Sequence, residues 1–76
     1  MALVRKLEPL DLERKQLHDE VEARWAAYKI DGTGFVQINT YGRKDREMPG
    51  KVSQTIQLDR QGAEQLIAIL RKSFSL

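Results

Sequence analysis

Apolar residues occupy every second position in two stretches near the middle of the chain, residues 21–28 and 35–41. A period of two is typical of a β-strand with one face toward a core. Between the stretches, Asp31-Gly32-Thr33-Gly34 supplies the glycines that a tight hairpin needs for positive φ angles. The pattern therefore predicts a β-hairpin, and a loop of either two or four residues is expected to place Ile30 opposite Phe35.

This pairing sorts the side chains of the hairpin into two faces, because successive residues of a strand point to opposite sides. The apolar face, expected to turn toward a helix, holds Val21, Ala23, Trp25, Ala27, Val36, Ile38 and Thr40. The polar face, which also carries aromatic rings, holds Arg24, Ala26, Tyr28, Ile30, Phe35, Gln37, Asn39 and Tyr41. Trp25 is accordingly expected to anchor the core.

The last third of the chain predicts a third strand and a closing helix. Residues 52–58 alternate again, so that Ile56 and Leu58 should join the core. The polar face would then continue through Ser53, Thr55 and Gln57. Asp59 is a suitable N-cap for a helix over residues 60–74. The apolar stripe of this helix is Ala63, Leu66, Ile67, Leu70 and Phe74. The fold class is therefore predicted as α+β: a small antiparallel sheet of three to four strands packed on a C-terminal α-helix, in ββ(β)α order.

The first residues give a weaker pattern. Residues 1–19 are expected to form an N-terminal arm or to contain a short helix from about Leu10 to His18, since Pro9 is tolerated only near a helix start. A loosely ordered arm is the competing interpretation, because chain termini are often poorly tied down. Residues 20–76 are then a single α+β domain.

The small size of the chain bears on its stability. A domain of 76 residues buries only about 60% of the surface that its unfolded chain exposes. The chain has no cysteine and one histidine, so neither disulfide bonds nor a typical metal site can stabilise it. We therefore expect a homodimer, which would enlarge the core. No apolar run of about 18 residues is present and the first residues lack a signal-peptide core, which predicts a soluble, cytoplasmic protein.

The charge is mildly basic overall and concentrated in one loop. Thirteen Lys and Arg against 11 Asp and Glu give a net charge of +2 and an isoelectric point of about 9.2. Residues 42–51 form a polar loop whose cations are Arg43, Lys44, Arg46 and Lys51. Because clustered cations neutralise phosphates, this loop is compatible with nucleic-acid binding.

Residue groups typical of catalysis are not apparent in the sequence. His18 has no second imidazole or thiol with which to form a zinc site. The serines lack a GxSxG context, and the acidic run of residues 19–22 is typical of a solvated surface. Residues 31–34 lack the Lys-Ser/Thr ending of a phosphate loop. We therefore expect no enzymatic activity, no cofactor, no metal and no small-molecule substrate.

The polar face has the composition of a single-strand binding surface. Its aromatic residues are Tyr28, Phe35 and Tyr41, and its polar ones are Arg24, Gln37 and Asn39. Bases stack on aromatic rings with about 1 to 3 kcal/mol each, while cations follow the phosphate backbone. The same aromatics could instead be buried against a dimer partner.

These motifs together are similar to the positive-cofactor-four family of transcriptional coactivators, whose small C-terminal domain binds single-stranded DNA as a dimer. The resemblance runs from Trp25 through the turn at residues 31–34 and Phe35-Val36-Gln37-Ile38. It continues through Met48-Pro49-Gly50-Lys51 to Ile56-Gln57-Leu58-Asp59 and the helix. The chain departs from the family at Thr55, where a glycine is usual. It also shows three clear strands before the helix instead of four, and residues 3–7 are the candidate for the fourth.

The resemblance implies a curved antiparallel sheet, dimerisation involving the C-terminal helix, and a nucleic-acid channel formed by strand faces and loops. It also implies phosphate contacts from the basic loop and stacking on the aromatic residues. The predicted nucleic-acid-binding residues are Arg24, Tyr28, Phe35, Gln37, Asn39, Tyr41, Arg43, Lys44, Arg46 and Lys51.

Pattern and resemblance thus predict single-stranded DNA or RNA binding with low sequence specificity, in an accessory role in transcription, replication or repair. The alternative is a homodimeric protein-interaction or regulatory module without nucleic-acid binding.

Overall fold

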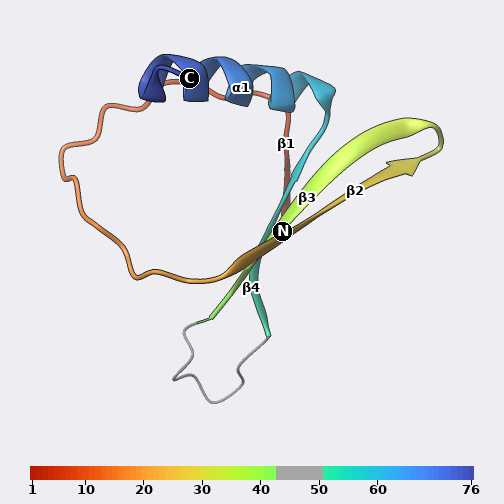
Figure 1. Cartoon of the computed structure of the whole chain (residues 1–76), viewed down its shortest axis with the longest axis horizontal. Coiled ribbons are helices and arrows are strands. Elements are labelled where there is room, and N and C mark those ends of the chain that lie inside the picture. The colour runs from red at the N-terminus through yellow and green to blue at the C-terminus, as the bar shows by residue number, and fades with distance from the viewer. Residues whose placement is uncertain (43–50) are drawn as a thin grey trace.

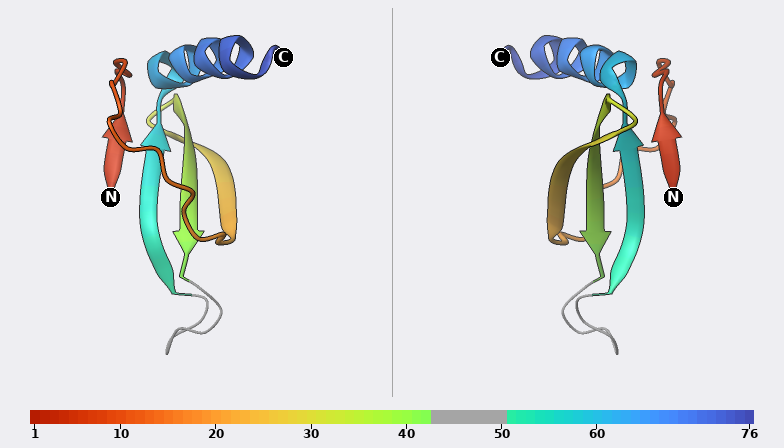
Figure 2. Two further views of the ribbon diagram at one scale, coloured as in Figure 1. Left: turned by 90° about the vertical axis from the view of Figure 1, so that its left-hand side faces the viewer. Right: turned by 90° about the vertical axis from the view of Figure 1, so that its right-hand side faces the viewer.

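The computed structural model of the chain describes residues 1–42 and 51–76, which form four strands and a C-terminal helix (Figure 1). The elements are β1 (Ala2–Val4), β2 (Ala23–Ile30), β3 (Thr33–Tyr41), β4 (Val52–Leu58) and α1 (Arg60–Phe74). The strands form one sheet, and α1 lies across one end of it and extends beyond one face (Figure 2). The predicted α+β fold with a C-terminal helix is confirmed.

The sheet is mixed, with the strand order β1-β4-β3-β2. Strand β3 pairs antiparallel with β2 and β4, whereas β1 pairs parallel with β4 and places Val4 opposite Leu58. The expectation of a wholly antiparallel sheet is therefore wrong for β1. Parallel pairing requires a long connection between the strands, and the whole hairpin separates β1 from β4.

A two-residue turn joins β2 to β3. Asp31 (φ 50°) and Gly32 (φ 79°) both have positive φ, the type I′ geometry that matches the twist of a hairpin. Tyr28 therefore pairs with Phe35, and the predicted pairing of Ile30 with Phe35 is wrong by two residues. The two predicted faces are retained, because a shift of two residues keeps each side chain on its own side of the sheet.

Local signals set both ends of α1, which begins and ends where the sequence predicts. The Asp59 carboxylate caps the first turn by accepting a hydrogen bond from the Gly62 N–H at 2.9 Å. Arg71 and Lys72 lie in the last turn, where cations are favoured. The first turn is seated tightly on β1, because Gly62 is buried and a Cβ there would collide with the Val4 carbonyl.

Residues 5–22, which we call the strap, run from β1 to β2 without helix or strand. The short helix expected from Leu10 to His18 is therefore wrong for this segment. An isolated helix of about nine residues is marginal in water, and residues 8–22 are exposed throughout, so little apolar burial is present to stabilise a helix there. Figures 1 and 2 show the strap as a wide arc on the side of the sheet over which α1 extends.

The chain leaves much of its apolar surface open. Among residues 1–42 and 51–76, Leu58 is the one hydrophobic side chain that is buried, with 7% of its surface exposed. Trp25, expected in the core, is 74% exposed, because α1 covers the Leu58 end of the apolar face and leaves the rest uncovered. The radius of gyration is 14.6 Å, against about 11.4 Å for a compact domain of this length. The core of a single chain is therefore incomplete.

Candidate nucleic-acid interface

The polar face draws its side chains from three strands, and the strand pairing decides which of them meet. Gln37 of β3 lies opposite Gln57 of β4, and Asn39 lies opposite Thr55. On the other side of β3, Tyr28 of β2 lies beside Phe35. Since directly opposed residues on one face are close neighbours, the pairing gathers these polar groups in the middle of the sheet.

Hydrogen bonds join these side chains into a ladder. The Tyr28 hydroxyl donates to Gln37 Oε1 at 2.7 Å and accepts from Gln57 Nε2 at 2.7 Å. Gln37 Nε2 donates to Asn39 Oδ1 at 3.0 Å, and the Thr55 hydroxyl donates to the same oxygen at 3.0 Å. All five side chains are half-buried. The ladder therefore holds the amides and the phenol in defined orientations before any ligand arrives.

Aromatic rings lie at both ends of this face. The ring centroids of Tyr28 and Phe35 are 6.3 Å apart and the ring planes are tilted by 31°, a favourable aromatic pair near the hairpin turn. Tyr41 is the last residue of β3, at the opposite end of the strand. All three residues are half-buried, so part of each stays open to solvent.

Arg24 is a cation that the structure places on the polar face. It lies on β2 opposite Asn39, and it shares the lining of a hollow of about 180 Å³ with Gln37, Asn39 and Tyr41. A guanidinium can pair with a phosphate through two hydrogen bonds or stack on an aromatic base. Trp25 and Ala26 complete the lining, and the hollow therefore offers donors and acceptors of the kind that bind a phosphate or the edge of a base.

Most of the predicted binding residues meet on this face. The ones that share it are Arg24, Tyr28, Phe35, Gln37, Asn39 and Tyr41. Lys51 is exposed at the residue before β4. Arg43, Lys44 and Arg46 lie outside the residues that the structure describes.

The structure adds Thr55 and Gln57 to the candidate site. Both bond to members of the predicted set, Thr55 to Asn39 and Gln57 to Tyr28. The alternation of residues 52–58 placed them on the polar face but did not select them as site residues. The register of β3 against β4, which sets amide opposite amide, is the signal that identifies them.

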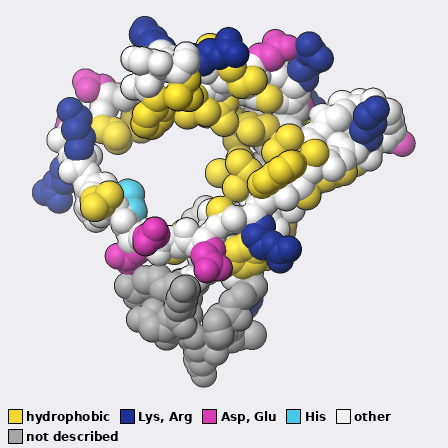
Figure 3. All heavy atoms as spheres, in the orientation of Figure 1, with side chains coloured by type: hydrophobic (Ala, Val, Ile, Leu, Met, Phe, Trp, Pro, Cys, Tyr) yellow, Lys and Arg dark blue, Asp and Glu magenta, His cyan; other side chains and the backbone are white. Residues whose placement is uncertain are grey.

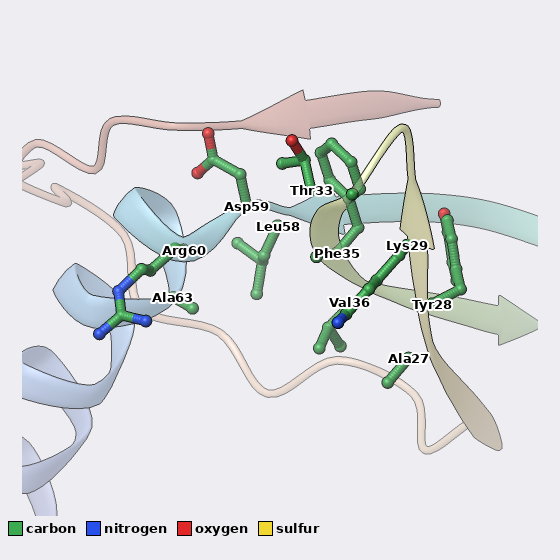
Figure 4. A pocket seen from close by; sticks show the side chains of 12 residues that line it. Ala27, Tyr28, Lys29, Thr33, Phe35, Val36, Leu58, Asp59, Arg60 and Ala63 are labelled. Carbon is green, nitrogen blue, oxygen red and sulfur yellow. The ribbon is translucent and has the colours of Figure 1, made fainter.

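A larger hollow of about 780 Å³ lies between the hairpin turn and the first turn of α1 (Figure 4). Its apolar lining includes Ala27, Val36, Leu58 and Ala63. Arg60, at the helix end, points away from the hairpin in Figure 4 and is bonded to Glu64 at 2.8 Å. Tyr28 and Phe35 of the polar face also line the hollow. Of its charged residues, Asp59 caps α1 and Arg60 pairs with Glu64, so these groups are engaged elsewhere and do not converge on the hollow.

Residues 1–42 and 51–76 contain neither a cluster of metal ligands nor a membrane-spanning helix. In these ranges, no three His, Cys, Asp or Glu side chains gather closely enough to hold a metal ion. No helix in the same ranges has the length and apolar character needed to cross a membrane.

Comparison of the chain with protein-family models, with curated proteins and with solved structures gives no match. The resemblance to the positive-cofactor-four family therefore stays a prediction from sequence motifs. Any function assigned to the chain has to follow from its two sheet faces.

Proposed function

We propose that this chain binds single-stranded DNA or RNA on the polar face of its sheet, with little sequence preference, and that it acts as a homodimer. The supporting observation is that an aromatic pair, a ladder of bonded amides and Arg24 form one surface. Neither α1 nor the strap covers that surface (Figure 2). A cytoplasmic accessory role in transcription, replication or repair is what the family resemblance adds to the proposal.

The binding would combine stacking with phosphate neutralisation. Bases can stack on the rings of Phe35 and Tyr41, with about 1 to 3 kcal/mol for each stacked base. Stacking tolerates every base because each base has a π-face, which explains a low sequence preference. Arg24 and Lys51 would contact phosphates. The amides of the ladder are fixed by their bonds to each other, so they lose little conformational freedom when a ligand binds.

The proposal of a homodimer is supported by surface area. The chain of 8.8 kDa exposes 7312 Å², whereas a compact monomer of this mass exposes roughly 4,800 Å². The excess is roughly 2,500 Å² per chain, or about 5,000 Å² for a pair of chains, and obligate homodimers bury about 2,000 to 5,000 Å² in total. The excess surface is therefore of the size that a stable pair of chains would bury.

Binding can be tested with labelled single-stranded and duplex oligonucleotides in fluorescence anisotropy across a series of salt concentrations. We expect tighter binding of the single strand, with a slope of log affinity against log salt of about −0.7 for each phosphate contacted. No binding at low salt, or an affinity indifferent to salt, would contradict the proposal.

A pair of cations on β2 provides a matched test of the face. Arg24 belongs to the polar face, whereas Lys29 stands on the other side of the same strand, opposite Gly34. Arg24→Ala should weaken binding about fivefold and reduce the salt slope by about 0.7, the effect of one lost phosphate contact. Lys29→Ala should change neither, and equal effects of the two substitutions would place the ligand elsewhere.

The alternative is a homodimeric protein-interaction module, and the exposed apolar surface is the observation that favours it. In that case Arg24→Ala and joint replacement of Arg43, Lys44 and Arg46 by Ala leave function intact. Phe35→Ala or Tyr41→Ala would then abolish partner binding without any effect of salt.

A further inference from the structure

The strap is much longer than the distance it has to cover. It joins β1 to β2, the two opposite edges of the sheet. Three strand spacings measure about 14 Å, because neighbouring strands lie about 4.8 Å apart. Val4 aligns with Ala27 across the sheet, so the start of β2 at Ala23 also lies about 14 Å further along the strands, and the straight distance is about 20 Å. The 18 residues numbered 5–22 could reach up to about 60 Å when extended. The surplus length forms the arc that stands away from the sheet in Figure 1.

Both ends of the strap are fastened. Near β1, the Leu7 N–H donates to Gln65 Oε1 at 2.8 Å, and Gln65 Nε2 donates to the Arg5 carbonyl at 2.7 Å. Arg5 also pairs with Asp59 at 3.0 Å. At the other end, the Tyr41 N–H donates to the carbonyl of residue 22 at 3.0 Å. The strap, α1 and the sheet thus close a ring.

The ring surrounds an opening with apolar walls. Figure 3 shows the opening, with hydrophobic side chains along its helix and sheet sides. The strap itself carries Leu10, 78% exposed, and Leu17, 98% exposed, and Leu12 is also exposed. On α1, Phe74 is 68% exposed and Ile67 and Leu70 are exposed with it. Leucines exposed to this extent gain little from hydrophobic burial within one chain.

We propose that the opening is filled by the C-terminal helix of a second copy of this chain, and that the strap closes over that helix. The inference rests on the homodimer of the proposed function and specifies how its two chains interlock. Each α1 would be held between the apolar face and the strap of its partner.

The shape and apolar surface of α1 fit this position. A helix of 15 residues is about 22 Å long and about 10 Å across, and the surplus length of the strap allows an arc around an object of that width. Ile69 lies off the main stripe of α1 and is exposed, so the helix has apolar residues on a second side. A helix enclosed by a sheet and a strap needs apolar groups on both sides.

Charge complementarity supports the same occupant. Over its residues 5–22 the strap holds six carboxylates against four cations, Arg5, Lys6, Arg14 and Lys15, which is a net charge of −2. Those carboxylates belong to Glu8, Asp11, Glu13, Asp19, Glu20 and Glu22. Lys6 pairs with Glu8 at 2.9 Å. The last turn of α1 carries Arg71 and Lys72. The basic end of the helix of one chain would therefore approach an acidic strap of the other, which favours this pairing over a neutral apolar partner.

The wild-type protein allows a direct test. A dimer mixed from ¹³C-labelled and unlabelled chains is examined by isotope-filtered NOE spectroscopy. We expect intermolecular contacts between the methyl groups of Leu10, Leu12 and Leu17 in the labelled chain and the Phe74 ring of the unlabelled chain.

Sedimentation of the same sample separates the possible failures. A dimer whose strap methyls show contacts only within their own chain would overturn the strap proposal and leave the homodimer intact. A mass of one chain would overturn both. Anisotropy with single-stranded oligonucleotide on the same sample reports on the polar face separately.

Substitutions in the strap provide a second test. Replacing Leu10, Leu12 and Leu17 together by Ser should raise the dimer dissociation constant by about a hundredfold or more, because buried leucines are lost. Exchange of subunits, followed by mass spectrometry of isotope-labelled mixtures, should become correspondingly faster. The matched control replaces Lys15, Gln16 and His18, exposed strap residues that carry no carboxylate, by Ser, and it should change the constant by no more than about threefold. Equal effects of the two triple variants would contradict the proposal.

Discussion

The two faces of the sheet differ in how far one chain can satisfy them. On the polar face, Tyr28, Gln37, Asn39, Thr55 and Gln57 bond to one another and are half-buried by their neighbours. On the apolar face, α1 covers the Leu58 end and leaves Trp25 largely in solvent. Hydrogen bonds are directional and can be completed between neighbouring strands, whereas an apolar surface is stabilised only when a second layer excludes water from it. The polar groups of one face are therefore satisfied within a single chain, whereas the apolar face of the same chain stays largely exposed.

Among single substitutions, the largest effect should come from replacing the exposed tryptophan of the apolar face. Trp25→Ser removes a large ring that we expect at the centre of the dimer interface, and such residues contribute about 2 to 4 kcal/mol to association. The dimer dissociation constant, measured by sedimentation equilibrium, should rise about 30-fold or more.

The aromatic control lies on the opposite face. Phe35→Ser removes a ring from the polar face, so it should weaken single-strand binding about tenfold and leave the dimer constant nearly unchanged. Loss of dimerisation by Phe35→Ser with no effect of Trp25→Ser would reverse the assignment of the two faces.

Gly62→Ala tests the corner where the apolar face is already covered. A Cβ at this position would collide with the backbone carbonyl of Val4, so β1 or the helix has to move. Overpacking of this kind costs about 1 to 3 kcal/mol in the free energy of unfolding, measured by urea denaturation at one fixed protein concentration. Gly34→Ala is the matched control: no atom lies within 4 Å of the added Cβ, so the free energy should change by less than about 1 kcal/mol.

How far the sequence predicts the structure depends on how local each signal is. The bounds of β4 and α1 follow from alternation, a cap and an apolar stripe within 23 consecutive residues, 52–74. The predicted register of the hairpin is wrong by two residues, because Ile30 lies opposite Phe35 only if all of residues 31–34 form the loop, whereas the chain turns at Asp31-Gly32 alone. Strand β1 has three residues and pairs across the chain, so no periodicity reveals its partner.

For the candidate site, the sequence predicted which residues share a face of the sheet, but not which side chains bond to one another or how much of each face is covered. The alternation of side chains along each strand was enough to place Arg24, Tyr28, Gln37 and Asn39 on one face. A shift of the hairpin register by an even number of residues keeps them on that face. The ladder could not be predicted, since it depends on the register of β4 against β3. Trp25 was assigned to a core because alternation indicates which face is apolar and not how much of that face the helix covers.

Tyr28→Phe tests the internal bonding of the polar face with a smaller effect. The substitution removes one donor and one acceptor from the ladder, leaving Gln37 and Gln57 without that partner. Because the groups are half-buried and water can replace the bonds in part, the free energy of unfolding should fall by about 1 kcal/mol. Tyr41→Phe is the control, since its hydroxyl has no hydrogen-bond partner within residues 1–42 and 51–76, and it should be near neutral. Equal losses would mean that the ladder adds no stability.

The smallest effect should come from the charge at the covered corner. Asp59 both caps α1 and pairs with Arg5, and Asp59→Asn keeps the cap while it removes the ion pair. Arg5 is mostly exposed, so the pair contributes about 0.5 kcal/mol or less, and urea denaturation in high salt should abolish the difference from wild type. Gly62→Ala would cost several times more, because close backbone contact and not charge holds the helix on β1. If Asp59→Asn lowered the free energy of unfolding as much as Gly62→Ala does, the strap and the helix would be joined mainly by charge. The contact between β1 and the first turn of α1 would then resemble the polar face, because polar contacts would stabilise it.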